Sequence, residues 1–313
     1  MDFSTIEAFL VKPCDFPIAF SLVTLVLCWI CLKIYRLLTR QKFNEQSVFL
    51  ITGGCMGIGR QMALRVSSLY KSTVIILDVQ SNLEEQIVKE INQQGGKGYF
   101  YKCDVSDYST VGEVIAKVYQ KFDKVDVLIN NAGIVAGHSI LDSDPKDFQK
   151  TMNVNYFGNI WMVKHILPRM KQRNRGHIVT IASVVSYQSS VKAGEYAASK
   201  HAVMAFHNTL RYELLKEDSN IDTTIVHPYC INTGMFKGFK ANLGFYILSE
   251  QKVAKRVITA TVNRELAIAI PGYFWILWHL MNFLPLWLSD WLLVKILDND
   301  CMSGFVGRAK QDQ

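Results

Sequence analysis

From Val48 onward, short apolar runs alternate with longer segments of mixed polarity. The apolar runs are rich in Val, Ile, Thr and aromatic residues, which is typical of buried β-strands. The segments between them, such as residues 82–94 and 109–122, carry apolar residues at helical spacing. Apolar strands that alternate with helices indicate a doubly wound α/β fold, in which helices cover both faces of a parallel sheet. Seven strands are expected, at residues 48–52, 73–78, 98–102, 126–131, 177–183, 223–228 and 267–271.

A long apolar segment precedes this alternating region. Phe16–Leu32 has no charged residue over seventeen positions, and basic residues follow it. The length is at the short end for a spanning helix, and the bulky, basic exit differs from that of a cleaved signal peptide. We therefore expect an uncleaved membrane anchor over residues 1–42, either spanning the bilayer or lying as a hairpin in one leaflet. The basic residues after it predict that the next domain faces the cytosol.

A second apolar segment follows the last predicted strand. Tyr273–Leu297 holds four of the six tryptophans, namely Trp275, Trp278, Trp287 and Trp291. This density of Trp is typical of a membrane interface, although core or dimer contacts and the wall of a substrate pocket are alternatives that can overlap with it. The chain is thus divided into an anchor (1–42), an α/β domain (47–271) and an aromatic-rich C-terminal apolar tail (272–313).

Composition narrows the classes of function. Seven scattered cysteines, an odd number, suit a reducing compartment better than a disulfide framework. The net charge of +7 comes largely from local basic clusters without interleaved aromatic residues, so nucleic acid is not an expected partner. The histidines lack acids or cysteines at metal-ligand spacing, and no metal is predicted.

A glycine-rich turn follows the first predicted strand, in the stretch TGGCMGIG. Gly53, Gly57 and Gly59, with Ile58 between the last two, allow a tight turn and close approach of a pyrophosphate to a helix N-terminus. The spacing is not GxGxxG, because three residues separate Gly53 from Gly57. Its place between a strand and a helix nevertheless predicts a dinucleotide site and hence a Rossmann-like domain.

The ends of the next strands supply further candidates for cofactor binding. Asp78 lies nineteen residues after Gly59, where an acid can bind the ribose hydroxyls and repel a 2′-phosphate. We therefore expect NAD, with NADP less favoured. Residues that could flank the adenine or leave room for the cofactor follow the third and fourth strands: Asp104, Val105, Asn131 and Ala132.

Tyr196 and Lys200 lie four residues apart, so they share one face of a predicted helix. Ser183 ends the fifth predicted strand, and ligands of open α/β sheets bind at such strand ends. Oxidation of an alcohol needs a base, but free tyrosine has a pKa of about 10. A nearby ammonium group lowers the pKa of a phenol, so Lys200 is expected to make Tyr196 a usable base. Ser183 would orient the substrate oxygen.

The motifs TGGCMGIG, CDV, NNAG, NVN, Ser183 and YAASK occur in the order and spacing of the classical short-chain dehydrogenase/reductase family, which this chain resembles. The resemblance implies that Tyr196 is the catalytic base, that Lys200 is its partner and a ribose ligand, and that Ser183 orients the substrate. It also implies that Asn155 holds a water of a proton relay and that Thr233 contacts the cofactor. Tyr229 stands where the family usually has a glycine in the same loop.

The apolar N-terminus, GHIVTIAS, TTIVHPYCINTGMF and GFVGRAK resemble the membrane-bound subfamily of epidermal-type retinol dehydrogenases and 17-beta-hydroxysteroid dehydrogenases 11 and 13. This subfamily implies lipophilic alcohols (retinol, hydroxysteroids or long-chain alcohols) and the endoplasmic reticulum or lipid-droplet membrane. A homodimer is also expected. Two alternatives stay open: an NADPH-dependent membrane ketoreductase of acyl-chain or sphingoid substrates, and a catalytically silent lipid-droplet scaffold.

Overall fold

A computed structural model of the chain describes residues 40–241, 246–297, 301, 302 and 304–306, together with Thr24, Leu27, Cys28, Ile30, Cys31, Ile34 and Leu38. From Gln41 onward, the described residues form one compact unit. The predicted anchor at residues 1–42 falls almost entirely outside the described residues. Among the described residues, no helix combines the length and the hydropathy needed to cross a membrane.

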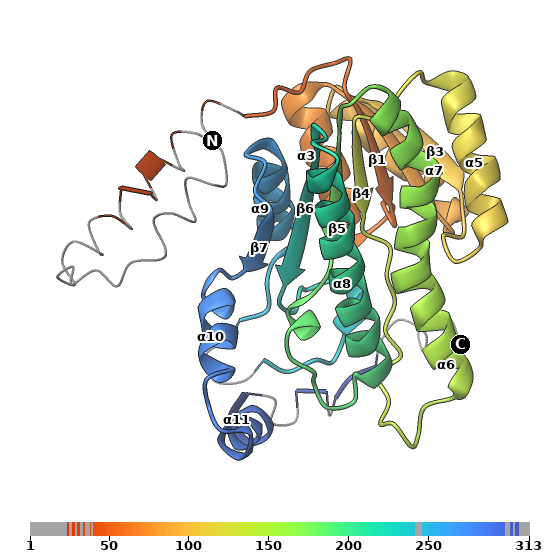
Figure 1. Ribbon diagram of the computed structural model, residues 1–313. Helices are drawn as coiled ribbons and strands as arrows, with labels where there is room; N and C mark the ends of the chain where they lie inside the picture. The colour runs from red at the N-terminus through yellow and green to blue at the C-terminus, as the bar shows by residue number, and fades with distance from the viewer. Residues whose placement is uncertain are drawn as a thin grey trace. The chain divides into compact units, whose positions relative to one another are not determined.

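One parallel sheet of seven strands forms the centre of the domain (Figure 1). Its strands are β1 (Val48–Thr52), β2 (Thr73–Asp78), β3 (Lys97–Lys102), β4 (Val127–Asn130), β5 (Gly176–Ile181), β6 (Ile221–Pro228) and β7 (Ala267–Ile270). Their order in space is β3-β2-β1-β4-β5-β6-β7. The fold class predicted from the hydrophobic pattern is confirmed. The order reverses between β1 and β4, which is where open α/β sheets bind their ligands.

Strands β4, β5 and β7 end one or two residues earlier than the sequence predicts, and at β4 and β5 the reason concerns the site. The backbone N–H of Asn131 donates to Thr52 Oγ1 at 2.9 Å, so the chain leaves the ladder after β4. Ser183 caps a short 3₁₀ turn, η3 (Val184–Ser186), and accepts a hydrogen bond from Val185 N. Both polar residues therefore leave the sheet at its carboxyl edge and project toward the candidate site.

Helices cover both faces of the sheet (Figure 1). Those of the domain are α3 (Gly57–Tyr70), α4 (Glu84–Gln93), α5 (Tyr108–Lys121), α6 (Pro145–Met152), α7 (Gly158–Gln172), α8 (Gly194–Lys216) and α9 (Glu250–Val262), with short turns η1 (Ser81–Leu83), η2 (Asn153–Phe157) and η4 (Gly234–Phe236). One buried apolar cluster joins α3, α4 and α9 to the sheet. A second joins α5, α7 and α8 to the other face. Each fully buried Ile or Leu in these clusters contributes about 1.5–3 kcal/mol.

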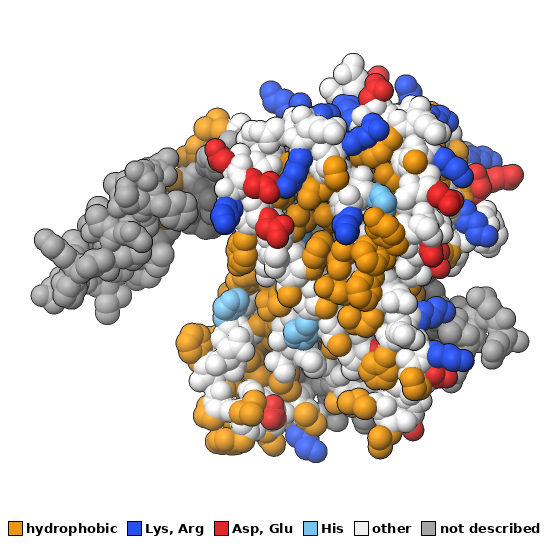
Figure 2. Space-filling view, turned by 45° about the vertical axis from the view of Figure 1, so that its right-hand side comes forward, with side chains coloured by type: hydrophobic (Ala, Val, Ile, Leu, Met, Phe, Trp, Pro, Cys, Tyr) orange, Lys and Arg blue, Asp and Glu red, His pale blue; other side chains and the backbone are white. Residues whose placement is uncertain are grey.

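The C-terminal tail forms α10 (Tyr273–Met281), α11 (Leu286–Leu292) and the π-helical turn η5 (Leu293–Leu297). Its inner side is buried through Phe274 and Met281. Hydrophobic side chains also gather on the surface at the lower end of Figure 2, the end where Figure 1 places α10 and α11. The exposed large hydrophobic residues among the described part of the tail are Tyr273, Trp275, Ile276, Leu280, Phe283, Leu286, Trp287, Trp291, Val294 and Val306.

Three histidines on the strands and α8 are completely buried: His177, His207 and His227. Burial lowers the pKa of His177 to about 3, and the positive charge of Arg264 acts in the same direction. Its ring nitrogens lie 3.2 Å from Gln41 Oε1 and 2.8 Å from Thr224 Oγ1. Because the unfolded chain binds a proton at His177 below pH about 6.5 and the native protein does not, unfolding becomes easier as the pH falls through this window.

We predict that the free energy of unfolding falls between pH 7 and pH 5, and that His177→Gln makes this fall shallower by up to about 2 kcal/mol. Urea unfolding of both proteins at the two pH values measures the difference. Above pH 7 the two proteins should change in parallel, because His177 is neutral in both states there. If the free energy of unfolding fell by the same amount in both proteins between pH 7 and pH 5, the assignment of a buried, neutral His177 would be contradicted.

Candidate active site

A cavity of about 610 Å³ lies at the carboxyl edge of the sheet. Residues from the ends of β1, β2, β4, β5 and β6 line it, together with α8 and the tail. Most of its lining is apolar, and the polar groups converge at a few points. This combination is typical of sites that bind an organic ligand and fix its orientation with a few polar contacts.

The glycine-rich turn forms one end of the cavity. Gly53 and Gly57 have positive φ values of 63° and 57°, which favour glycine. Gly59 does not line the cavity but is packed tightly behind it, because a Cβ atom there would lie 2.2 Å from Gly53 O. Ile58 lines the cavity beside Gly57. The first turn of α3 therefore lies close to the loop, and its backbone N–H groups are available to bind an anion.

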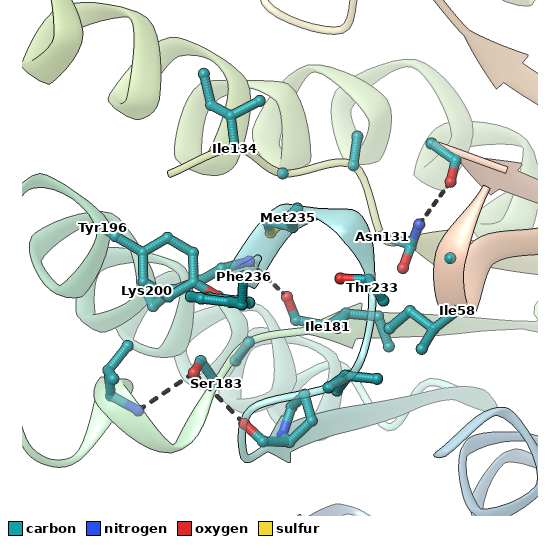
Figure 3. A pocket seen from close by; sticks show the side chains of 18 of the residues that line it. Ile58, Asn131, Ile134, Ile181, Ser183, Tyr196, Lys200, Thr233, Met235 and Phe236 are labelled. Atoms are coloured by element: carbon teal, nitrogen blue, oxygen red, sulfur yellow. Dashed lines mark hydrogen bonds between the residues drawn. The ribbon is translucent and has the colours of Figure 1, made fainter. Parts of the chain in front are cut away.

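Asn131 fixes this loop to β4. Its side-chain Nδ2 donates to Thr52 O and Gly53 O, both at 2.9 Å. Thr52 Oγ1 accepts hydrogen bonds from the backbone N–H of Asn131 and Ala132. Figure 3 shows Asn131 at the cavity beside Ile58. Asn131 and Ala132 therefore line the cavity where β1 and β4 diverge, as the sequence predicts for cofactor-binding residues.

Asp78 lies at the end of β2 and lines the same cavity. Its carboxylate accepts hydrogen bonds from Cys55 N at 3.0 Å and Gln80 N at 3.1 Å. These contacts orient the side chain with its charge at the cavity wall. Gln80 and Met56 line this region as well, and neither was a candidate from the sequence.

The remaining predicted cofactor ligands also reach the cavity. Asp104 and Val105 line it, and Asp104 Oδ1 accepts from Ser106 N at 2.9 Å, which orders the turn after β3. Thr233 lines it at the start of η4. The cavity thus brings together predicted cofactor ligands that are as much as 180 positions apart, from Gly53 to Thr233.

Tyr196, Lys200 and Ser183 face one part of the cavity (Figure 3). Lys200 Nζ lies 5.6 Å from the centre of the Tyr196 ring and donates to Ile181 O at 2.9 Å. Ser183 Oγ donates to Pro228 O at 3.4 Å and accepts from Val185 N at 3.3 Å. All three residues are buried. Their hydroxyl, phenol and ammonium groups therefore converge in a region that is largely shielded from water.

Burial dominates the acid–base properties of the pair. It raises the pKa of Tyr196, and a hydrogen bond with Ser183 acts in the opposite direction. Burial also lowers the pKa of Lys200 to about 8. Desolvation is thus the largest effect on Tyr196 in this structure, and it favours the neutral phenol. The lowering of the Tyr196 pKa by Lys200, with the cofactor charge acting in the same direction, stays a prediction for the cofactor-bound site.

Asn155 lies behind the cavity and does not line it. It is completely buried in η2, where Oδ1 accepts from Ile134 N at 2.8 Å and Nδ2 donates to Ile134 O and Ser199 Oγ at 2.9 Å. Its backbone carbonyl accepts from Asn159 Nδ2 at 2.6 Å. Asn155 thus joins η2 to the loop after β4 and to α8. The relay water expected from the family resemblance stays a prediction.

The part of the cavity beyond Ser183 and Tyr196 is formed by the loop after β6 and by the tail, for which the sequence left a pocket wall open as one of three alternatives. Tyr229 stacks on Phe274 at 4.9 Å between ring centres, and Phe236 packs edge-on against Tyr196 at 5.7 Å. Trp278 lines the cavity, so one of the four tail tryptophans forms part of a pocket wall. Other apolar residues of this wall are Val184, Val185, Met235, Phe239, Leu293 and Met302.

The last described residues close this wall by pairing with the loop after β6. Lys240 N donates to Cys301 O, and Val306 N donates to Lys237 O, both at 2.9 Å. Gly238 has a φ of 85°, and a Cβ atom there would lie 1.8 Å from Gly304 O, so only glycine fits. Sequence periodicity could not predict this contact, because it joins two irregular segments more than sixty residues apart.

Comparison with known proteins agrees with this geometry. The family model for short chain dehydrogenases matches residues 47–244. Retinol dehydrogenase 10-B of Danio rerio is 31% identical over 297 residues, which cover 87% of this chain and 88% of that protein. Short-chain dehydrogenase/reductase family 16C member 6 of Bos taurus is 30% identical, with 89% and 90% covered.

Solved structures share the fold. A short chain dehydrogenase/reductase from Burkholderia phymatum in complex with NAD has a TM-score of 0.71 at 24% identity, covering 83% of this chain and 98% of that one. A metagenomic short-chain oxidoreductase in complex with NADP has a TM-score of 0.62 at 21% identity, covering 72% and 95%. The predicted family is thus confirmed, and with it an NAD(P)-dependent alcohol oxidoreductase. The chain belongs to the short-chain dehydrogenase family, in the branch that includes the retinol dehydrogenases.

Proposed function

We propose that this protein is an NAD-dependent dehydrogenase that interconverts a lipophilic alcohol, of the retinol, hydroxysteroid or long-chain class, and its aldehyde or ketone. The observation that carries the proposal is the position of Ser183, Tyr196 and Lys200 beside a mainly apolar cavity wall. Such a wall offers little to a small polar alcohol but buries the body of a lipophilic one. The names of the relatives, retinol dehydrogenases among them, support the same substrate class.

The residues around the glycine-rich turn fit a dinucleotide. The loop at Gly53 and Gly57 and the first turn of α3 would hold the pyrophosphate. Asp78 would accept hydrogen bonds from the ribose hydroxyls, and its negative charge would repel a 2′-phosphate. When bound, oxidised NAD supplies the hydride acceptor and a positive charge that favours a phenolate.

The protein's own groups then handle the proton. Ser183 Oγ donates a hydrogen bond to the substrate oxygen and stabilises its developing negative charge. The phenolate of Tyr196 accepts the hydroxyl proton as the hydride leaves the carbinol carbon. The ammonium group of Lys200 favours the phenolate, since it lies on the same side of the cavity. In the direction of reduction, Tyr196 returns the proton.

We further propose that the tail binds a lipid surface at the mouth of the site. Phe274 and Trp278 of α10 and Leu293 of η5 line the cavity. On α11, which lies between them in the chain, Trp287 and Trp291 are 72% and 53% exposed. Exposed tryptophans bind well at the interface of a bilayer, and a lipophilic substrate dissolves in the same bilayer. Together with the predicted anchor, this supports the endoplasmic reticulum or a lipid droplet, with the domain facing the cytosol.

Tyr196→Phe tests the chemistry. We expect turnover to fall about 10²–10⁴-fold while NAD binding persists, because only the titrating hydroxyl is removed. Steady-state rates with retinol and NAD, together with NAD titration by fluorescence, measure both properties. Tyr212→Phe is the matched control on the same helix, since Tyr212 is exposed and outside the cavity. Activity above about a tenth of wild type in Tyr196→Phe would refute the assignment of the base.

Asp78→Ala tests the cofactor preference. We expect weaker binding of NAD and a smaller discrimination against NADP, because the substitution removes both the hydroxyl acceptor and the repelling charge. The ratio of kcat/KM for the two cofactors is the measurement. Asp107→Ala is the control: it removes an exposed helix cap, which should lower stability by about 1 kcal/mol without changing the ratio. A wild-type protein that prefers NADPH would favour the ketoreductase alternative instead.

Sedimentation with phosphatidylcholine vesicles tests the tail. A chain that begins at Gln41 should still bind vesicles in part, and Trp287→Ser with Trp291→Ser should release it. The truncation retains Gln41 because its backbone N–H donates to Val262 O inside the compact unit. Leu141→Ser is the control, since Leu141 is 96% exposed on another loop. Complete solubility of the truncated chain with its tryptophans intact would contradict the lipid contact.

A further inference from the structure

His227 lies directly behind Ser183 and contacts the backbone that carries it. The residue is completely buried near the end of β6. Its Nδ1 lies 2.7 Å from Ser186 Oγ and 3.2 Å from Ser183 O, and its Nε2 lies 3.1 Å from the Tyr187 hydroxyl. Both ring nitrogens are therefore engaged with the short turn from Ser183 to Tyr187.

The hydrogen-bond pattern assigns every proton of this cluster. Ser183 O can only accept, and Ser186 Oγ donates to it. Ser186 Oγ must then accept from His227 Nδ1, so Nδ1 carries the proton of a neutral ring. The proton also points toward Ser183 O, and His227 Nε2 is left to accept from the Tyr187 hydroxyl. The cluster is consistent with one tautomer and satisfies all of its donors.

The side chain of Ser183 is held less firmly than its backbone. Besides its hydrogen bond with the Tyr196 phenol, its Oγ makes two long contacts with the backbone, at 3.4 Å to Pro228 O and 3.3 Å from Val185 N. Hydrogen bonds of this length are weak. The direction of Oγ therefore depends on the backbone of the turn, which His227 and Ser186 fix through Ser183 O. His227 thus contacts the carbonyl oxygen of Ser183, and the next residue, Pro228, accepts a hydrogen bond from the Ser183 side chain.

We propose that His227 is a positioning residue for Ser183, holding the turn so that the hydroxyl of Ser183 faces the reacting oxygen. The inference rests on the proposed function of Ser183. His227 itself does not line the cavity. It acts through the turn, and its loss would displace Ser183 Oγ. A displacement of about 1 Å at a reacting group can cost about a hundredfold in rate.

His177 provides the matched control, because it is an equally buried neutral histidine that also bonds through both ring nitrogens. It lies at the amino end of β5, opposite to the site. A purely structural role would make the two histidines equivalent: removal of either would lower stability, and neither would change turnover in the folded protein.

The test compares His227→Leu, His227→Asn and His177→Leu in the full-length protein, each with Ser183 intact and with Ser183→Ala. Asn can place an amide N–H near the position of Nδ1, whereas Leu removes both contacts. Rates with retinol and NAD give kcat and KM, and thermal unfolding reports folding. We expect His227→Leu to lower kcat about tenfold or more with little change in the KM for NAD, and His227→Asn to recover most of the loss.

In the Ser183→Ala background, His227→Leu should lower kcat by less than about twofold, because the group that it positions is gone. The proposal would be overturned if His227→Leu lowered kcat by the same factor with and without Ser183. It would also be overturned if His227→Asn and His227→Leu lowered kcat equally, or if His177→Leu lowered kcat as much as His227→Leu. If His227→Leu does not fold, Tyr187→Phe replaces it: removal of the donor to Nε2 should lower kcat severalfold, again only when Ser183 is present.

The positioning role of His227 and the proposed function can be refuted independently of each other. An active Tyr196→Phe would refute the proposed chemistry itself. An inactive Tyr196→Phe together with wild-type turnover in both His227→Leu and Tyr187→Phe would refute only the positioning role.

Discussion

The site depends on the hydrogen bonds that hold the glycine-rich turn to β4. Strands β1 and β4 are neighbours, but the chain leaves them in opposite directions, so the helices that follow cannot cover the edge between them. Asn131 and Thr52 cross this edge with four hydrogen bonds. They hold the loop open at the place where a dinucleotide needs free backbone N–H groups, and the cavity extends from there.

Burial then determines how the polar groups around the cavity can act. Lys200 is only 3% exposed, and its Nζ donates a hydrogen bond to Ile181 O. An ammonium group in this environment is costly, and so is a phenolate at Tyr196. Desolvation therefore raises the pKa of Tyr196 and lowers that of Lys200, and both shifts favour the neutral form of the group. The same shielding strengthens any attraction between charges that do form, which makes ionisation of the pair sensitive to what occupies the cavity.

The hydrophobic pattern was sufficient to predict the sheet, because buried parallel strands contain continuous apolar runs, such as residues 74–77 of β2, and end in distinct turns. It also located the chemistry that lies at strand ends, including Asp78, Asn131 and Ser183. It could not predict that Asn155 bonds to Ile134 and Ser199 behind the cavity, nor that burial raises the pKa of Tyr196. Those properties follow from packing between distant segments. The pairing of Gly238 with Gly304 belongs to the same class, since neither segment has a periodic pattern.

The apolar wall of the cavity comes mostly from the stretch that follows β6 and from the tail. The groups proposed to bind the cofactor and move the proton come, apart from Thr233, from the first 200 residues. The reacting groups and the pocket wall that would contact the substrate therefore come from separate parts of the chain. A change of side chain in the tail can therefore reshape the pocket wall while the sheet and its catalytic edge stay unchanged. The family model matches residues 47–244 and leaves the tail out, so likeness to the family says least about the part of the chain that shapes this wall.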